Sequence, residues 1–240
     1  MIILTGDTHR NFDRIFEFCE AYGTARDDVL VILGDAGINY YLDEADEALK
    51  RELSQLDVTL LCVHGNHEER PFAIFSYEEA EWRGGLVYVE PEFPNLLFAK
   101  DGEIYNLEGR TVMTIGGAYS VDKYYRIANG LPWFENEQPS DQTKDYVEAR
   151  LAKAGWQVDY IFSHTAPLQY EPRHAFLPGL NQEAVDKSTE KWLDSIQRRV
   201  RCNGWFCGHY HIDDQQGPVR ILQNDFLELD TEDSWAHLEW

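Results

Sequence analysis

The sequence has few cysteines and contains no long apolar run. The four cysteines lack paired CxxC spacing, which predicts reduced and mostly buried thiols and argues against a disulfide framework or a zinc knuckle. No apolar stretch approaches the roughly 20 residues that a membrane-spanning helix needs. The amino terminus has no basic segment followed by a long apolar core, as a signal peptide would. We therefore expect a cytoplasmic protein that does not contact a membrane.

Basic residues are also scarce. Lysine and arginine total 21 against 43 aspartates and glutamates, so the formal net charge is −22. Such a surface repels polyanions, which disfavours extended nucleic acid as a partner and a processive nuclease as the function. The chain does have 43% hydrophobic residues over 240 positions, enough to bury a large core. Because it contains no linker, internal repeat or low-complexity segment, the sequence predicts a single domain over residues 1–240.

Short apolar runs alternate with amphipathic segments over the first seventy residues. Strands are predicted at 1–6, 27–34 and 58–65, and helices at 12–23 and 41–56. Continuous apolar strands separated by helices indicate βαβ units and a mainly parallel sheet that is covered on both faces.

The remainder of the chain mixes hairpins, loops and further helices. Close-set strand candidates, which predict hairpins, lie at 85–92, 95–102, 103–109 and 110–117. A loop-rich segment is expected from 117 to about 139. The last part is predicted to hold helices at about 141–154 and 182–200, strands at 158–164 and 204–209, and a final hairpin of 219–224 and 225–230.

Side chains of metal-binding types follow five of the predicted strands. The segments GDTH, GDAG and GNHE end the first three strands, and His164 and the segment GHYH end two later ones. In a parallel sheet the carboxyl ends of the strands share one edge, so we expect these side chains to meet there. The set comprises Asp7, His9, Asp35, Asn66, His67, His164, His209 and His211. A cap or turn would explain an isolated aspartate, but caps favour serine and threonine and have no use for histidine.

The chemistry of this set indicates divalent metal ions. Carboxylates, an amide and imidazoles without thiolates suit manganese, iron, zinc, nickel or cobalt, of which we favour manganese. Seven of these eight side chains already exceed the demand of one ion, whereas two ions that share one carboxylate would use all seven. Two ions about 3.5–4 Å apart clamp the attacking and leaving oxygens of a phosphoryl transfer and acidify a bound water. The sequence therefore predicts a dinuclear site at the strand ends.

The same segments, in the same order, make the chain resemble the calcineurin-like metallophosphoesterase superfamily between residues 6 and 211. The resemblance implies a four-layer α/β sandwich with mixed sheets flanked by helices. It assigns the first metal to Asp7, His9 and His211, and the second to Asn66, His164 and His209. It also implies that Asp35 bridges both ions, that a bridging hydroxide is the nucleophile, and that His67 is the general acid.

Two differences from the superfamily motifs limit which of its members the chain resembles. Serine/threonine phosphatases of this superfamily carry GDxHG and GDxVDRG, but Arg10 follows GDTH here and GDAGINY lacks the Asp-Arg-Gly. Protein phosphatase activity of that type is therefore not expected. The chain resembles the small bacterial and phage members of the superfamily instead.

Several residues near the motifs are candidates for holding substrate phosphate oxygens. These candidates are Arg10, Arg70, Lys123, Tyr124 and Arg126. The alternative is that the cations form ordinary surface salt bridges, which are common and weak.

The sequence thus predicts a metal-dependent phosphoesterase that acts on a small phosphate ester. Within the enzymes, the alternative is a nuclease or a cyclic-nucleotide phosphodiesterase. From another class, the alternative is a metal-bound interaction module without turnover. The complete ligand set together with His67 favours an enzyme, and the net charge of −22 favours a small substrate. The sequence does not distinguish monoester from diester substrates, and it leaves the oligomeric state open.

Overall fold

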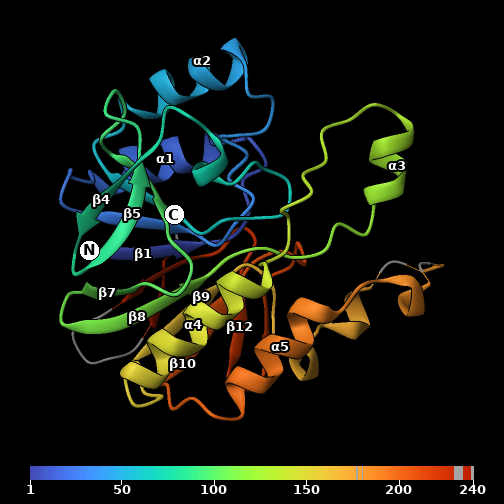
Figure 1. Ribbon diagram of the computed structural model, residues 1–240. Coiled ribbons are helices and arrows are strands. Elements are labelled where there is room, and N and C mark those ends of the chain that lie inside the picture. Colours follow the sequence, from blue (N-terminus) through green and yellow to red (C-terminus); the bar gives the residue numbers. More distant parts are fainter. Residues whose placement is uncertain (177, 180, 230–234, 239–240) are drawn as a thin grey trace.

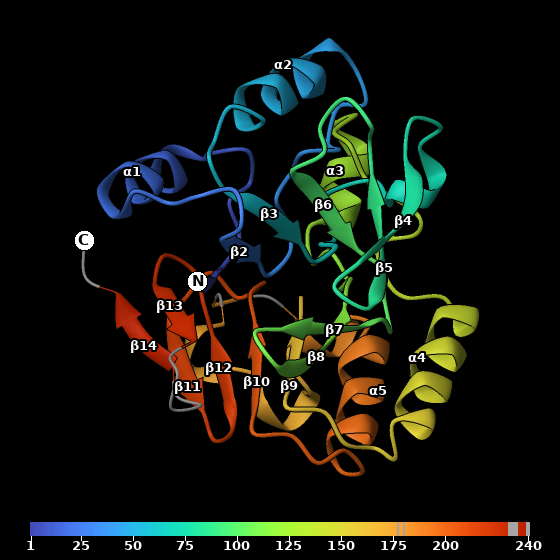
Figure 2. The ribbon, with the colours of Figure 1, turned by 90° about the vertical axis from the view of Figure 1, so that its left-hand side faces the viewer.

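Two β-sheets lie face to face between two layers of helices in a computed structural model that describes residues 1–176, 178–179, 181–229 and 235–238 (Figures 1 and 2). Sheet A has the order β14-β13-β1-β2-β3-β6-β5-β4. Its strands are β1 (Ile2–Thr5), β2 (Val29–Ile32), β3 (Thr59–Cys62), β4 (Glu78–Trp82), β5 (Gly85–Val89), β6 (Leu96–Ala99), β13 (Phe226–Leu229) and β14 (Trp235–Leu238). β1, β2, β3 and β6 are parallel, and the outer strands are antiparallel to their neighbours.

Sheet B has the order β11-β12-β10-β9-β8-β7. Its strands are β7 (Ile104–Leu107), β8 (Arg110–Ile115), β9 (Tyr160–Ser163), β10 (Gly204–Cys207), β11 (Asp214–Gln216) and β12 (Val219–Ile221). The central four, β8, β9, β10 and β12, are parallel, and β7 and β11 pair antiparallel at the two edges. Both sheets are therefore mixed, as the resemblance implied.

The helices cover the two outer faces, so the layers are helix, sheet, sheet and helix (Figure 2). The longer ones are α1 (Asp13–Tyr22) and α2 (Glu44–Leu53) beside sheet A, and α4 (Asp141–Lys153) and α5 (Ser188–Gln197) beside sheet B. Short 3₁₀ turns lie at Pro71–Ala73, Leu168–Tyr170, Arg173–Ala175 and Gln182–Ala184. The four-layer sandwich is thereby confirmed. In the described part of the chain, no helix has the length and apolar character needed to cross a membrane.

Helix ends follow the local sequence. α1 ends at Gly23, which adopts φ 61° and donates its backbone N–H to the Cys19 carbonyl. Asp43 is the N-cap residue of α2 and Ser140 is that of α4, and each of these side chains accepts a backbone N–H from the first turn.

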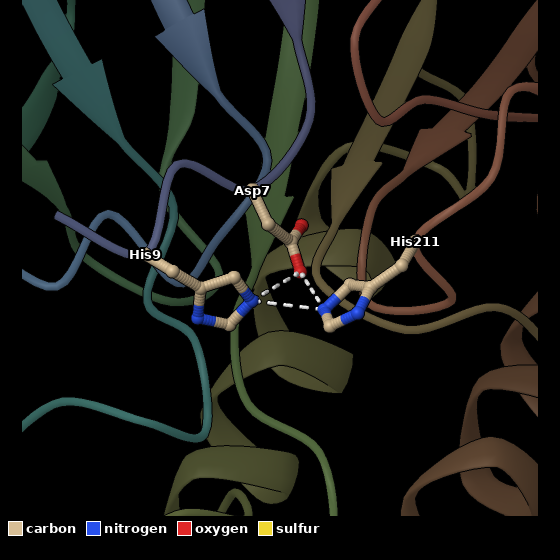
Figure 3. Close-up of side chains that lie close together, drawn as sticks. All are labelled: Asp7, His9 and His211. Atoms are coloured by element: carbon tan, nitrogen blue, oxygen red, sulfur yellow. Dashed lines mark hydrogen bonds and ion pairs between the residues drawn. The ribbon is translucent and has the colours of Figure 1, made fainter. Parts of the chain in front are cut away.

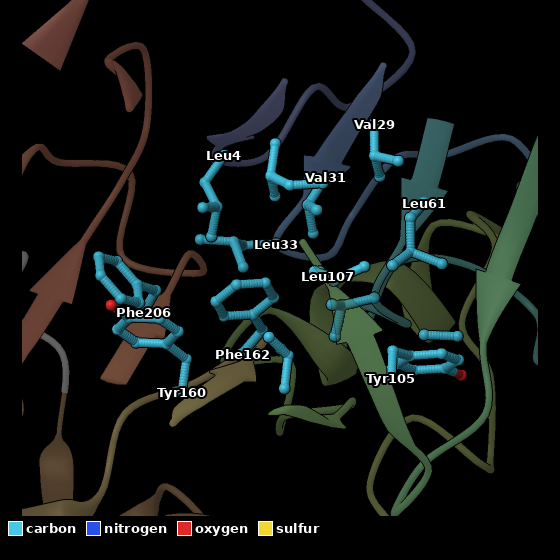
Figure 4. Packing of buried hydrophobic residues seen from close by; sticks show 14 of the residues in the cluster. Leu4, Val29, Val31, Leu33, Leu61, Tyr105, Leu107, Tyr160, Phe162 and Phe206 are labelled. Carbon is cyan, nitrogen blue, oxygen red and sulfur yellow. The ribbon is translucent and has the colours of Figure 1, made fainter. Parts of the chain in front are cut away.

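The core divides into three apolar clusters, one in each gap between layers. β1 illustrates why a strand of this sheet carries apolar side chains on both of its faces. Ile2 and Leu4 point into the gap between the sheets, whereas Ile3 packs under the helices of sheet A. Figure 4 shows the central gap, where Leu33 of sheet A meets Phe162 and other side chains of sheet B. All four cysteines, which fall in described segments, are free thiols, and three of them are buried.

The predicted hairpin of 219–224 and 225–230 is wrong in its described part. β12 belongs to sheet B, and β13 crosses to sheet A and pairs with β1. The reason lies in Asp213, whose carboxylate accepts the backbone N–H groups of Gln223, Asn224 and Asp225. These donors are satisfied without strand pairing, so the chain can leave one sheet for the other. Residue 230 lies outside the described residues.

Other elements also differ from the sequence expectation, among them β11 and β14, which were not predicted. β4 was not predicted because its sequence, EEAEW, is an acidic edge strand without an apolar run. The helix expected at 182–200 is a short 3₁₀ turn followed by α5. The segment expected as a loop from 117 to about 139 contains α3 (Lys123–Ala128), which projects from the body on an arm (Figure 1).

Candidate metal centre

The carboxyl ends of five strands bring the predicted side chains to the edge that both sheets share. Sheet A supplies the residues after β1, β2 and β3, and sheet B supplies those after β9 and β10. From sheet A come Asp7, His9, Asp35, Asn66 and His67. From sheet B come His164, His209 and His211. The site is therefore built between the sheets and not along one of them.

One group of possible ligand atoms joins the two sheets through Asp7 (Figure 3). The Asp7 Oδ2 atom lies 3.7 Å from His9 Nε2 and 3.4 Å from His211 Nε2, and the two imidazole nitrogens are 2.8 Å apart. The other carboxylate oxygen of Asp7 accepts the backbone N–H of His209 at 3.0 Å. Asp7 is buried, whereas His9 and His211 are open to solvent on the outer side.

A second group consists of Asp7, Asp35 and His164, all of them buried. Asp35 Oδ2 lies 3.6 Å from His164 Nε2 and 3.9 Å from His9 Nε2. Its other oxygen accepts the His67 backbone N–H at 2.8 Å. Asp35 therefore reaches a histidine of each group.

The contact between His164 and Asn66 tests whether a cation fits here. His164 Nδ1 lies 2.9 Å from the Leu33 carbonyl, so this nitrogen carries a proton and Nε2 is the ring atom turned toward the site. Asn66 Oδ1 lies 2.8 Å from that Nε2, and Asp35 Oδ2 lies 3.6 Å from it. An imidazole nitrogen, an amide oxygen and a carboxylate oxygen are ligand types that divalent transition metals accept. The donor set therefore fits a bound divalent ion.

The backbone of the site is unusual. His9, Asp35, His209 and His211 all have positive φ angles, between 46° and 68°. Non-glycine residues adopt this region at a cost, and such strain concentrates at functional sites. Gly208 is required for a different reason, since a Cβ atom there would collide with the Asp7 carboxylate.

Electrostatics keep the central carboxylate ionised. Burial alone would raise the pKa of Asp35, but His164, His67, His9 and the His67 backbone N–H outweigh it and hold the pKa below its ordinary value. Burial lowers the pKa of His209, and the neighbouring His164 lowers it further, so its ring is neutral with a free lone pair. The hydrogen bond to Asp7 raises the pKa of His211.

His67 lies beside the two groups without joining either. Its ring centre is 5.7 Å from that of His9, and its backbone, not its ring, is bonded to Asp35. Burial lowers the pKa of His67, Asp35 opposes this, and Arg126 lowers it again. The ring borders a cavity of about 480 Å³ at the metal edge.

Two of the five predicted substrate contacts are bound to carboxylates elsewhere. The Arg10 guanidinium contacts Asp46 and donates to the Gly37 carbonyl at 2.7 Å. Arg70 is buried, with Nη1 2.6 Å from Asp101 Oδ2, and it borders a separate cavity of about 380 Å³. Both side chains therefore take part in ion pairs, and their contact with substrate stays a prediction.

The other three lie on the arm beside the site. Arg126 donates to Asp122 at 2.7 Å and to the Tyr40 hydroxyl at 3.1 Å, and its positive charge lowers the pKa of His67. The Lys123 ammonium sits 4.1 Å from the centre of the Trp133 ring. Tyr124 is 73% exposed. All five candidates belong to the described chain, and none of them lines the cavity at the metal edge.

Two further residues belong to the surroundings of the site. Lys187, held by Glu171 at 2.6 Å, is a cation that does line this cavity. No sequence motif marks it. Glu68 is fully buried and accepts the backbone N–H groups of Gly37 and Gly65, so it ties together the loops that carry Asp35 and Asn66. Burial raises the pKa of Glu68 to about 8.

A two-sheet α/β sandwich with a carboxylate and histidine centre at its shared edge defines a class of metal-binding hydrolases. The family model for calcineurin-like phosphoesterases matches residues 1–213, and the chain belongs to that family. The family supports phosphoester hydrolysis as the general activity and implies divalent metal ions.

Solved structures agree on the fold. The chain is similar to protein TT1561 of Thermus thermophilus, with a TM-score of 0.53, 13% sequence identity, and coverage of 99% of this chain and 97% of that one. Another crystal structure has a TM-score of 0.55 and 14% identity, with coverage of 99% and 98%. Identities this low establish the fold alone. Among curated proteins, no sequence matches the chain.

Proposed function

We propose that the protein hydrolyses a small phosphate ester with two divalent transition-metal ions, manganese being the first candidate, at the shared edge of sheets A and B. One ion would be held by Asp7, His9 and His211, the other by Asn66, His164 and His209, and both by Asp35. The observation that carries the proposal is the position of Asp35, within 4 Å of His9 on one side and of His164 on the other.

Ions bound there would orient the phosphoryl group, stabilise its developing charge and acidify a water molecule. The protein itself supplies three further functions. Strained loops fix the ligands before binding, as described for His9 and Asp35. Glu68 keeps two of these loops together. The apolar wall of the cavity, which includes Phe176 and Tyr210, excludes water from one side.

His67 is suited to protonating the leaving oxygen. It borders the cavity, and its ring is not among the atoms that group around a candidate ion in the described chain. Because burial lowers its pKa, the protonated ring is a stronger acid than a solvated imidazolium. Positioned proton donation would assist the departure of a basic alkoxide.

A small ester is favoured over a long nucleic acid. The formal net charge of −22 repels a polyanion, and the cavity of about 480 Å³ is in the range of small-ligand sites.

A screen with the chelator-treated protein tests the proposal. With manganese restored, we expect two ions per chain and hydrolysis of p-nitrophenyl phosphate, of its bis-ester, or of both. A cyclic nucleotide and a short oligonucleotide in the same screen test the alternative enzymes. Two bound ions without hydrolysis of any of these esters would instead indicate a non-catalytic binding module. Absence of bound metal would refute the proposed centre.

Arg126 and Lys123 are proposed to hold phosphate oxygens from the arm. Arg126→Ala is expected to raise KM by roughly 10-fold and to change kcat less, because a ground-state phosphate contact contributes uniform binding. Lys123→Ala should act in the same direction. Steady-state kinetics against Arg51→Ala, which removes an exposed cation on α2, measure the effect. Unchanged KM in both arm variants would return these residues to a structural role.

A further inference from the structure

The cavity at the metal edge extends beyond the residues that would hold the ions. Besides the strand-end residues, it is lined by the arm and by the segment between β9 and α5, which lie on the same side of the molecule (Figure 1). That segment contributes Ala175, Phe176, Gln182 and Lys187. A cavity of about 480 Å³ accommodates a ligand much larger than a phosphoryl group. Room therefore remains for the alcohol part of an ester.

Aromatic side chains connect the metal edge with Lys187. The ring centre of His209 lies 5.0 Å from that of Tyr210. The Tyr210 ring is nearly parallel to that of Phe176, with 18° between the planes and 6.2 Å between the centres. The Lys187 ammonium lies 5.1 Å from the centre of the Phe176 ring, and the Tyr210 hydroxyl lies 2.9 Å from Thr165 Oγ1. An ordered apolar wall therefore leads from a proposed metal ligand to a cation.

The Lys187 side chain is held in place before any ligand binds. Its ammonium donates to Glu171 Oε1 at 2.6 Å, and only 16% of the Lys187 side chain and 3% of the Glu171 side chain are exposed. Lys187 is also the N-cap residue of α5, where the Ser188 backbone N–H donates to Asp186 at 2.9 Å. A cation held in this way loses little side-chain entropy on binding. The bond to Glu171 uses one of the three N–H donors of an ammonium group, so the group has further donors to offer.

The carboxyl groups around this cation do not cancel its charge. Glu171 is bonded to Lys187, and its other oxygen lies 4.0 Å from the Arg173 guanidinium, so one negative charge faces two positive ones. Burial raises the pKa of the nearby Glu190 to about 7, so this group is only partly ionised at neutral pH. Asp122, which lines the cavity from the arm, is already paired with an arginine of the arm at 2.7 Å. In a protein of net charge −22, this end of the cavity is therefore a local site for an anion.

Lys187 is placed for the leaving part of a substrate and not for the phosphoryl group. The ions would bind the phosphoryl oxygens, and the contacts that lead from His209 to Lys187 pass through two aromatic rings. We propose, building on the proposed function, that Lys187 selects phosphate esters whose alcohol part carries a second anionic group, such as a carboxylate. In such a substrate the apolar part of the alcohol would lie along Phe176 and Tyr210, and its anionic oxygen would accept a hydrogen bond from Lys187.

Two aryl phosphates that differ in one charge test the proposal. 4-Carboxyphenyl phosphate carries the second anion, whereas 4-methylphenyl phosphate has an apolar group at the same position. With manganese bound, Lys187→Met is expected to lower kcat/KM for the carboxylate by about 10-fold, mainly through KM, because a charged hydrogen bond that serves ground state and transition state alike is lost. The same variant should change kcat/KM for the methyl compound by less than about 2-fold.

Three further variants separate recognition from folding. Lys187→Arg keeps the charge and should keep the preference for the carboxylate. Lys187→Met combined with Glu171→Gln leaves no unpaired buried carboxylate and should still lack the preference. Lys191→Met is the matched control, because this lysine, in the described part of α5, is exposed and does not line the cavity. Elemental analysis should find two manganese ions per chain in every variant.

The outcomes separate this proposal from the proposed function. Equal losses on the two substrates in Lys187→Met would place the ammonium on the phosphoryl group, and unchanged kinetics would leave it in its ion pair alone, so either result refutes the selection. Loss of the carboxylate preference in Lys191→Met would refute it too. If the wild type binds two ions and hydrolyses neither ester, the proposed hydrolysis fails, and calorimetric titration with the two corresponding phosphonates still tests Lys187 through the same difference of about 10-fold. A wild type without bound manganese would refute both proposals.

Discussion

Asp35→Asn is expected to lower kcat/KM by about three orders of magnitude, the largest effect of any carboxylate substitution in the protein. A metal-binding carboxylate provides several kcal/mol of transition-state stabilisation through its ions, and each 1.36 kcal/mol corresponds to about a tenfold change in rate. Asp35 is placed to serve both groups, at 3.9 Å from His9 and 3.6 Å from His164. An amide is neutral and offers one oxygen, so it cannot replace the carboxylate at both.

Two measurements check this result, kcat/KM with manganese and elemental analysis of the loaded protein. The wild type should hold two ions per chain and the variant fewer. Asp101→Asn provides the control, since this buried carboxylate pairs with Arg70 outside the site. Full metal content and full activity in Asp35→Asn would show that Asp35 does not bridge.

His67→Ala is expected to lose turnover to an extent that depends on the leaving group. Positioned proton transfer is worth about 10²–10⁴-fold, and it matters when the departing oxygen is a basic alkoxide. The variant should therefore be slowed by that factor on alkyl phosphates and much less on p-nitrophenyl phosphate, whose nitrophenolate leaves without a proton. Its metal content should stay near that of the wild type.

The comparison of the two substrates gives His67 its specific test. Equal losses on both would mean that the imidazole positions substrate or stabilises charge without donating a proton. A collapse in metal content would instead place His67 among the ligands and require a new assignment of the second ion. His174→Ala, at an exposed histidine paired with Asp214, serves as the control.

The parallel strands around the site could be predicted from sequence because local rules determine them. β1 is apolar on both faces, and α1 ends at Gly23, which supplies the left-handed conformation of its cap. A glycine-containing motif after each strand then places Asp7, Asp35 and Asn66 at one edge. Bringing these three residues together needed only the rule that the carboxyl ends of parallel strands lie at one edge of a sheet.

Contacts between distant segments could not be predicted in the same way. The tail crosses between sheets because Asp213 satisfies three backbone donors, a fact that no periodicity encodes. Lys187 likewise lines the cavity only because the folded chain brings it there, where Glu171 holds it. The carboxylate partners of Arg10 and Arg70, which come from α2 and from the turn after β6, are likewise contacts between distant segments.

The placement of the centre between two sheets has a consequence for how the molecule resists unfolding. Asp7, Asp35 and Asn66 follow strands of sheet A, whereas His164, His209 and His211 follow strands of sheet B. Each bound ion would thus add a non-covalent cross-link to the apolar contacts and hydrogen bonds that already join the two sheets. A ligand that binds only the folded state adds about 2.7 kcal/mol at a concentration of about 100 times its Kd. Metal binding would therefore raise the free energy of unfolding of this protein as well as support its chemistry.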